Sequence, residues 1–323
     1  MKRRYFRWIG WGLVTCIVSI LISCTQSPQT PLRVGTNIWP GFEPLFLARD
    51  LGYYQGHPIE LRDYPSSTEV SQALRNGDIE VAALTLDETL LLAQTNPDIR
   101  VILITDFSNG ADVLMAKPEI KTLQELKGKK VGAESNALGG YVLSRVLDKA
   151  KLSPKDLQVI SMGVSEHEQA YKQNQVDAVV TFEPVRSNLL STGAKILFDS
   201  SQIPREIVDV LVVPEALLTQ HEADLKALLK GWFQALDYNQ QNPQAAAQKM
   251  AARSQVSPEQ FIKSLQLLTI PDQQTNLKLL SQTDSSLVQS AQRLLNVMLD
   301  KKLIDRSISI EPLLNAQLIQ SIQ

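Results

Sequence analysis

The chain of 323 residues has little of what metal and redox sites are built from, with two Cys and three His. A structural zinc site, a disulfide framework or an iron–sulfur cluster cannot be assembled from that supply. The sequence also lacks any run of Lys or Arg beyond its first seven residues, and its 32 basic residues face 34 acidic ones. Because nucleic-acid binding needs a surface that neutralises phosphates, we expect no DNA or RNA partner.

The motifs of the common enzyme classes are missing as well. The sequence contains no phosphate-binding GxxxxGK[ST], no GxSxG nucleophile turn and no HExxH zinc helix. His57, His167 and His221 each lie in a polar stretch that is typical of the protein surface. We therefore expect none of them to be catalytic, and we expect a protein without enzymatic activity, cofactor or bound metal.

What remains is the composition of an ordinary globular protein. Apolar residues make up 44% of the chain and charged residues 20%, with 15 Gly and 16 Pro. These proportions exclude collagen, coiled coils and intrinsic disorder. The length allows one large domain or two medium ones.

The first residues are typical of an export signal. A basic start is followed by Trp8 to Ile22, a run of 15 residues without a charge. About 20 apolar residues are needed to span a membrane, so this run is too short for an anchor helix. It ends at Leu21-Ile22-Ser23-Cys24, which resembles the lipobox of bacterial lipoproteins. We predict that residues 1–23 are a lipoprotein signal peptide and that Cys24 is lipidated.

The predicted processing places the protein outside the cytoplasm, attached to a membrane. Residues 24–31 would form a polar tether, and Cys16 would leave with the signal, so the mature chain could not form an internal disulfide. Arg3-Arg4 resembles the twin-arginine export pattern, but Lys2 stands where that pattern has Ser or Thr. General secretion and twin-arginine export both remain open.

From Leu32 onward, short apolar runs alternate with helical patterns, which predicts an α/β fold. The predicted strands are 32–36, 59–63, 81–84, 101–104, 113–116, 130–133, 158–162, 178–181, 195–198 and 208–213. Helix starts are expected at Ser66, Thr122 and Ser165, where each hydroxyl precedes a Glu by three residues. After Pro214 the pattern becomes all helical, and Trp232 belongs to an apolar stripe that indicates core packing.

Polar and aromatic residues follow the predicted strand ends, where open α/β sheets bind ligands. The candidate ligand-binding residues are Trp39, Phe42, Glu43, Thr85, Asp87, Asn109, Asp112, Ser135, Asn136, Gly139, Phe182, Glu183 and Asp209. Trp39 has no apolar stripe to join, so it suits a stacking wall. Ser135 and Asn136 precede a helix start that could receive an acidic group. The alternative for the carboxylates is that they cap helices.

Six short stretches together resemble a known family. They are Leu32-Arg33-Val34-Gly35 with Leu51-Gly52-Tyr53-Tyr54, Gly77-Asp78-Ile79-Glu80-Val81-Ala82, Leu126-Lys127-Gly128-Lys129-Lys130-Val131-Gly132, and Val176-Asp177-Ala178-Val179-Val180 with Glu183-Pro184. In this order they look like the nitrate/sulfonate/taurine family of ABC-transporter substrate-binding proteins.

The resemblance implies a type II periplasmic binding protein fold: two α/β lobes with a hinge, a ligand cleft between them and a helical C-terminal region. Lobe one would comprise residues 32–111 plus 207–323, and residues 112–206 would form the inserted lobe two. The crossovers are expected near 112–118 and 204–209. Such a protein would capture a small solute by lobe closure, as a monomer, and deliver it to an ABC permease driven by an ATPase.

The solute is predicted to be cationic or zwitterionic. The segments after the strand ends hold eight carboxylates, among them Glu43, Glu183 and Asp209, and no basic residue. A buried anion beside unpaired carboxylates would be strongly unfavourable. A sulfonate or nitrate ligand stays open, as does a lipoprotein that reports to a signalling receptor. An enzyme like the thiamine-pyrimidine synthases, which share the fold, is a further alternative. Resemblance to those proteins rests on a Cys-rich motif with a His, and the mature chain has no Cys beyond Cys24.

Overall fold

The computed structural model describes residues 30–134 and 137–322, and from Leu32 onward the chain forms a unit of its own. The predicted signal peptide, Cys24, Ser135 and Asn136 lie outside the described residues. Within the described residues, no helix is both long enough and apolar enough to cross a membrane.

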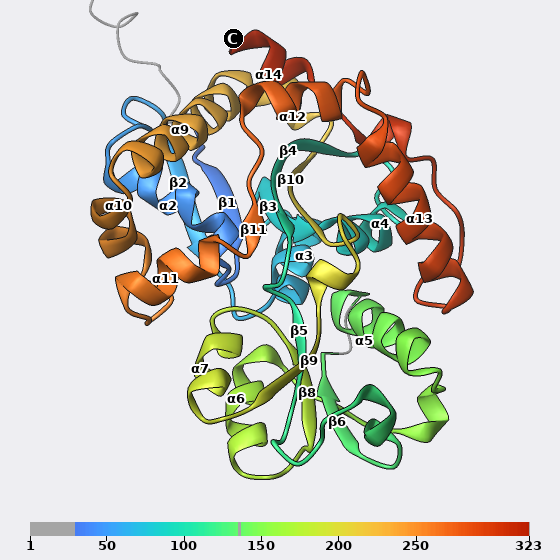
Figure 1. The fold of residues 1–323 in the computed structure, drawn as a ribbon. Coiled ribbons are helices and arrows are strands. Elements are labelled where there is room, and N and C mark those ends of the chain that lie inside the picture. Colours follow the sequence, from blue (N-terminus) through green and yellow to red (C-terminus); the bar gives the residue numbers. More distant parts are fainter. Residues whose placement is uncertain (1–29, 135–136, 323) are drawn as a thin grey trace, which may run out of the picture. The chain divides into compact units, whose positions relative to one another are not determined.

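A six-stranded sheet carries the first part of the chain (Figure 1). Its strand order is β11-β4-β10-β3-β1-β2, with bounds β1 Leu32–Thr36, β2 Ile59–Asp63, β3 Val81–Thr85, β4 Ile99–Ser108, β10 Val208–Pro214 and β11 Leu268–Thr269. β1 pairs in parallel with β2 and β3, whereas β10 runs antiparallel to β3 and β4. β3 is buried throughout, as expected for a central strand that is covered on both faces.

A five-stranded sheet forms the second lobe, with the order β7-β6-β8-β5-β9. Its strands are β5 Val113–Ala116, β6 Lys130–Ala133, β7 Gln158–Ser161, β8 Ala178–Thr181 and β9 Lys195–Asp199. β6 pairs in parallel with β7 and β8, and β5 runs antiparallel to β8 and β9. The predicted α/β fold with two lobes is confirmed.

Helices fill the connections and the C-terminal region (Figure 1). They are α2 Glu43–Asp50, α3 Ser67–Asn76, α4 Leu86–Ala93, α5 Ala137–Ala150, α6 Val164–Lys172, α7 Val185–Ser191, α8 Leu217–Gln220, α9 Glu222–Gln241, α10 Pro243–Met250, α11 Pro258–Leu265, α12 Gln273–Leu280, α13 Ser286–Asp300 and α14 Gln317–Ser321. Short 3₁₀ turns are η1 Pro40–Phe42, η2 Leu123–Leu126, η3 Pro154–Asp156, η4 Ser200–Gln202 and η5 Glu311–Leu313. Trp232 on α9 is fully buried, as its stripe predicted.

Two short segments connect the sheets and are bonded to each other. They run from β4 to β5 and from β9 to β10. Ser200 Oγ lies 2.8 Å from Ser108 Oγ and accepts the Gly110 N–H at 2.6 Å. The expected first crossover at 112–118 is misplaced, because β5 is already a strand of the second sheet.

Three further expectations about elements are wrong in detail. The region after Pro214 is not all helix, because the two residues of β11 pair with the end of β4. The helix expected at Ser165 begins at Val164, where Gly163 donates its N–H to Glu166 Oε2 at 2.8 Å. The start at Thr122 leads only into a 3₁₀ turn, without a hydroxyl cap. The cap at Ser66 is confirmed, since its Oγ accepts the Glu69 N–H.

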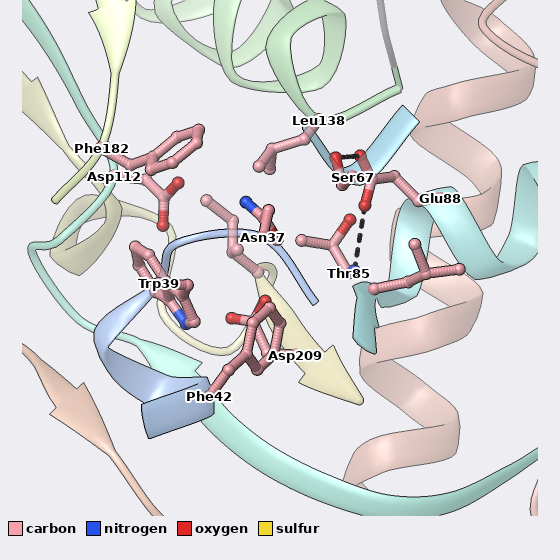
Figure 2. A pocket seen from close by; sticks show the side chains of 12 residues that line it. Asn37, Trp39, Phe42, Ser67, Thr85, Glu88, Asp112, Leu138, Phe182 and Asp209 are labelled. Atoms are coloured by element: carbon pink, nitrogen blue, oxygen red, sulfur yellow. Dashed lines mark hydrogen bonds between the residues drawn. The ribbon is translucent and has the colours of Figure 1, made fainter. Parts of the chain in front are cut away.

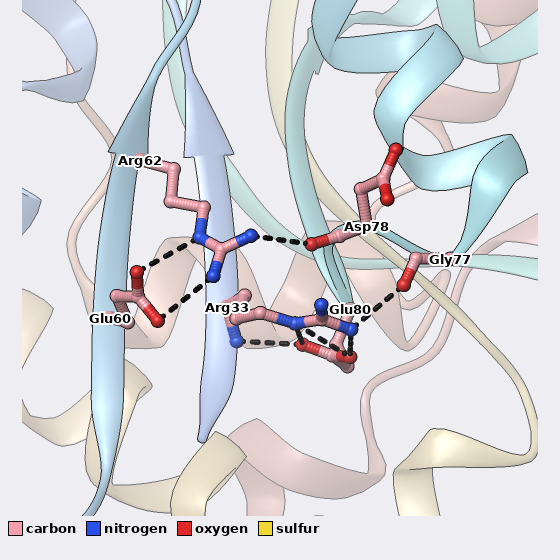
Figure 3. Close-up of polar contacts among 6 residues, drawn as sticks. All are labelled: Arg33, Glu60, Arg62, Gly77, Asp78 and Glu80. Atoms are coloured by element: carbon pink, nitrogen blue, oxygen red, sulfur yellow. Dashed lines mark hydrogen bonds and ion pairs between the residues drawn. The ribbon is translucent and has the colours of Figure 1, made fainter. Parts of the chain in front are cut away.

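Arginine side chains tie the edge of the six-stranded sheet to the turn before β3 (Figure 3). On β1, Arg33 Nε donates to Glu80 Oε2 at 2.9 Å, and its Nη2 donates to the Gly77 carbonyl at 2.8 Å. On β2, Arg62 Nη1 donates to the Asp78 carbonyl at 3.0 Å and pairs with Glu60. These bonds fix the entry to β3, and the site begins where that strand ends.

Candidate functional site

The carboxyl ends of several strands meet between the two sheets. In the six-stranded sheet, β1 ends before Asn37 and β3 ends at Thr85. β10 runs in the opposite direction, so its early residue Asp209 lies opposite both Thr85 and Asp106. In the other sheet, β8 ends before Phe182. Strand polarity therefore gathers residues that are far apart in the sequence.

A small cavity lies at this meeting point (Figure 2). Its lining combines aromatic, apolar and acidic side chains from both lobes: Asn37, Trp39, Phe42, Ser67, Leu84, Thr85, Glu88, Asp112, Leu138, Phe182, Ile207 and Asp209. The centre of a water molecule can occupy about 20 Å³ of it. That is room for about one water, so an organic solute needs the lobes to part or the side chains to shift.

Two aromatic side chains from different lobes close one side of the cavity (Figure 2). Trp39 and Phe182 meet edge to face, with ring centroids 5.8 Å apart and planes at 82°. The Trp39 Nε1–H donates to Asp106 Oδ2 at 3.1 Å, which fixes the indole. A Cβ at position 41 would stand 2.6 Å from Trp39 Nε1, so Gly41 makes this bond possible.

Asp112 and Asp209 supply the cavity with acceptor atoms that no described residue satisfies. Both side chains are almost fully buried, and the Oδ2 atom of each has no hydrogen-bond partner. Burial raises the pKa of Asp112 to about 7. Burial and the nearby Asp106 raise the pKa of Asp209 well above its usual value. Buried oxygens without partners are costly, so they indicate a ligand with hydrogen-bond donors.

Asp106 and Asp209 lie opposite each other in the pairing of β10 with β4, so the two buried carboxyl groups would repel each other if both were ionised. Burial raises the pKa of Asp106 to about 6, although the bond from Trp39 opposes that rise. Burial and this repulsion therefore favour the protonated forms of the two carboxyl groups when no ligand is bound.

The next two carboxylates begin helix α4. Glu88 Oε2 accepts the Thr85 N–H at 3.1 Å, which caps the helix while the side chain also lines the cavity. Asp87 is buried beside it but does not line the cavity, and burial raises its pKa to about 8. Among the described residues, no group of His, Cys, Asp and Glu has the arrangement of a metal site.

Two predicted site carboxylates are paired elsewhere, which corrects the expectation that no basic residue faces them. Glu43 Oε1 accepts from Arg253 Nε at 2.9 Å, and Arg253 also pairs with Asp63 and donates to the Asn37 carbonyl. Glu183 Oε1 accepts from Arg186 Nη1 at 2.9 Å and its Oε2 from the Ser187 N–H, within helix α7. Neither lines the cavity. The capping alternative therefore describes Glu183.

The other candidates divide between the cavity and its surroundings. Six predicted residues line the cavity: Trp39, Phe42, Thr85, Asp112, Phe182 and Asp209. Gly139 lines a neighbouring chamber in the second lobe, whereas Asn109 is exposed and lines a separate pocket beside β11. Ser135 and Asn136 lie outside the described residues.

The sequence analysis did not single out several residues that line the cavity. Ser67 was treated only as part of a helix start, and Leu138 and Ile207 carry no chemical signal in the sequence. His167 was expected at the surface but is 1% exposed, because α6 turns it toward Thr181 on β8. A prediction that α6 begins before Ser165 would have placed His167 on the buried face of that helix.

Relatives of known name match large parts of the chain. The family described as NMT1/THI5 like matches residues 39–246. The taurine-binding periplasmic protein of Escherichia coli (strain K12) is 24% identical over 220 residues. That alignment covers 67% of this chain and 66% of the relative, just under two thirds of its length.

Solved structures share the two-lobed fold. The alkanesulfonate-binding protein SsuA from Xanthomonas axonopodis pv. citri, bound to MOPS, superposes with a TM-score of 0.73 at 16% identity, covering 90% of this chain and 98% of that one. The desulfurization enzyme DSZB superposes with a TM-score of 0.70 at 15% identity, covering 91% and 99%. The fold therefore occurs in binding proteins and in an enzyme. From its match over more than half of the sequence, the chain belongs to the NMT1/THI5-like family.

Proposed function

We propose that this protein is an extracytoplasmic solute-binding protein that captures a small solute between its lobes and delivers it to an ABC permease. The observation that supports it most is the enclosed cavity, where aromatic and acidic side chains of both sheets converge. The periplasmic relative that binds taurine supports the location and the transport role. The proposal requires no covalent chemistry, although the likeness to a desulfurization enzyme keeps a catalytic role testable.

The solute is proposed to donate N–H groups and to be cationic or zwitterionic. No Lys, Arg or His is among the described residues that line the cavity, whereas Glu88, Asp112 and Asp209 are. The Oδ2 atoms of Asp112 and Asp209 have no partner, so an ammonium or amine could satisfy both. The Trp39 and Phe182 rings beside them suit a cation, which is attracted to aromatic faces.

Two segments are proposed as hinges. Residues 32–111 with 207–323 would move as lobe one and residues 112–206 as lobe two, about the connections held by Ser108 and Ser200. The cavity is too small for an organic solute as it stands, so binding would begin from a more open state. A solute that contacts both lobes stabilises the closed state relative to the open one.

An anionic solute is the second candidate, and the names of the relatives favour it. Taurine carries a sulfonate as well as an ammonium group, and SsuA is an alkanesulfonate-binding protein. In the described part of the cavity, carboxylates would repel a bare sulfonate. Among the described lining residues, the Asn37 amide and the Thr85 hydroxyl could donate hydrogen bonds to it.

Calorimetric titration of the chain from Thr25 onward distinguishes the two candidates. The panel is propylamine, choline, 2-aminopyrimidine, taurine, methanesulfonate and nitrate. Binding of amines or aminopyrimidine that weakens at least tenfold in Asp209→Asn, and not in the control Asp305→Asn at an exposed position, supports the proposal. Binding of methanesulfonate or nitrate alone overturns the solute class. Catalytic turnover of any panel member would contradict a pure binding role.

We propose further that the lipid-modified Cys24 anchors the mature protein to a membrane. The lipobox and the polar tether in the sequence support this. Membrane fractionation tests it, because Cys24→Ser should leave the folded protein in the soluble fraction. Retention of that variant in the membrane would contradict lipid anchoring.

A further inference from the structure

We propose that His167 is a specificity residue of this cleft, and that its Nε2 atom accepts a hydrogen bond from an N–H or O–H group at one end of the solute. The inference rests on the proposed solute-binding function and narrows the class of solute. It assigns a role to a side chain that the sequence analysis had placed on the surface.

A second chamber adjoins the main cavity inside the five-stranded lobe. Asp112, Leu138 and Phe182 line both the cavity and the chamber. His167 and Thr181 line the second chamber and not the main cavity. The centre of a water molecule can occupy about 10 Å³ of it. That volume suits a single group of the size of a water molecule, such as a hydroxyl or an amino group.

His167 presents one bare nitrogen in this chamber's wall. Its Nδ1 lies 3.1 Å from Thr181 Oγ1, and the ring also has a hydrogen bond to the backbone of Met162. Nε2 has no partner in the described structure, although the side chain is only 1% exposed. Burial lowers the pKa of His167 to about 4, so the ring is neutral at neutral pH. We assign the proton to Nδ1, with Thr181 Oγ1 accepting it, and in this tautomer Nε2 is an acceptor.

The arrangement describes a solute with donors at two places. One donor group meets the carboxyl oxygens of Asp112 and Asp209, and the second extends past Phe182 toward His167. A solute without the second donor leaves the buried Nε2 unsatisfied. Sites that hydrogen-bond a substrate group discriminate strongly against analogues that lack it.

Two probes with the same charge and the same three-carbon chain test the inference. Calorimetry compares 3-amino-1-propanol with propylamine, which lacks only the terminal hydroxyl. We expect 3-amino-1-propanol to bind about tenfold more tightly to the unmodified chain from Thr25 onward. The preference should vanish in His167→Phe and persist in the control His221→Phe, whose side chain pairs with Asp224 outside the cleft.

A spectroscopic readout separates ligand contact from a structural role of His167. The chain has three histidines, so ¹⁵N-histidine labelling gives signals from three imidazoles. The signals that are missing from the His167→Phe spectrum belong to His167. In the free protein we expect His167 Nε2 to show the resonance of an unprotonated nitrogen. When 3-amino-1-propanol is added, this resonance should move toward that of a hydrogen-bonded nitrogen. Equal affinities for the two probes, or an Nε2 resonance that stays in place at saturation, overturn the inference.

The proposed solute class can fail separately. If neither amine binds while taurine does, the Nε2 resonance in the taurine titration decides: movement keeps His167 in the site, and no movement removes it. If none of the three probes binds, both the solute class and the role of His167 are overturned.

Discussion

At the scale of single residues, the site is governed by carboxyl groups buried without cations. Burial raises the pKa values of Asp106, Asp112 and Asp209, and the neighbouring Asp106 raises that of Asp209 further. In solution each would ionise near pH 4, so the folded chain holds protons that the unfolded chain releases. A bound cation would take the place of those protons. The stability of the free protein and its affinity for a cation should therefore both depend on pH.

The first prediction concerns this linkage. Because the folded chain binds more protons than the unfolded chain above about pH 4, the melting temperature without solute should fall as pH rises through 6 and 7, the pKa values of Asp106 and Asp112. Affinity for propylamine should rise over the same range, since the cation needs ionised carboxylates. Differential scanning calorimetry and titration from pH 5 to 8 measure both.

Asp209→Asn is the control for that prediction, because it removes one of the buried carboxyl groups while keeping the shape. Both pH dependences should become shallower in this variant, and the remaining slope should come from groups such as Asp112 and Asp87 that still titrate. A wild-type melting temperature that rises between pH 6 and 8, or an affinity for propylamine that falls, would contradict the raised pKa values of these carboxyl groups.

The second prediction concerns Arg253, which stabilises the loop before the cavity. Its guanidinium pairs with the buried Glu43, donates to the Asn37 carbonyl and lies over the Phe46 ring at 3.7 Å. Removing one partner of a buried ion pair costs about 3–5 kcal/mol. Arg253→Ala should lose that much unfolding free energy in urea. The double variant Glu43→Gln/Arg253→Met should recover most of it, and a loss below about 1 kcal/mol in Arg253→Ala would contradict the assignment.

These pairings also show where sequence reasoning reaches its limit. The carboxylates at strand ends were identified from their positions after apolar runs, and Asp112 and Asp209 line the cavity as expected. Arg253 lies 210 residues after Glu43, and no local pattern connects the two. Whether a carboxylate is neutralised depends on long-range packing, so Glu43 and Glu183 were wrongly counted as unpaired.

At the scale of elements, helix α5 of the second lobe contacts the C-terminal region of the first. Lys301 Nζ, just after α13, pairs with Asp148 Oδ1 on α5 at 2.7 Å. Leu303 lies against Gly140, where a Cβ would come within 3.0 Å of it. α5 is also held to the second connecting segment, since Tyr141 Oη donates to Glu206 Oε2 at 2.6 Å and Arg145 pairs with the same carboxylate. We expect the Lys301–Asp148 and Leu303–Gly140 contacts, which join the two lobes, to form only in the closed arrangement.

The third prediction follows from that contact. Lys301→Ala should weaken solute binding by a few-fold without touching the cavity, because it removes an interaction that only the closed state makes. Stability should change little, since both side chains are partly exposed. Calorimetry with the best solute of the panel measures the affinity. The exposed Lys278→Ala is the control, and equal affinities for the two variants would remove the contact from the closure equilibrium.

The elements themselves were largely predictable, with exceptions that have physical causes. Ten of the eleven strands in the described part of the chain were recognised, because each was identified from an apolar run between turn residues. β11 was missed because two residues cannot show a period, and its pairing partner on β4 lies far away in the sequence. Helix α6 was displaced by one residue because Gly163, which has no side chain to cap with, still provides the N–H that Glu166 accepts.

At the scale of the whole molecule, the two sheets enclose a site that neither contains alone. Trp39 comes from one lobe and Phe182 from the other, and their contact is made across the cleft. The order of the family motifs predicted this architecture, which the structure neighbours confirm. The solute could not be predicted in the same way, because it depends on side-chain pairing inside the cleft.

The central claim is that a solute with N–H donors closes the lobes, and a distance measurement across the cleft tests it most directly. Glu69→Cys on α3 and Ser165→Cys on α6 place labels on exposed positions of the two lobes, in a chain from Thr25 onward that has no other cysteine. Single-molecule energy transfer then reports the open and closed populations. We expect 3-amino-1-propanol to increase the short-distance population of the labelled protein. The same labelled protein with Asp209→Asn should show no such increase. An unchanged distance distribution at a concentration that saturates binding would contradict it.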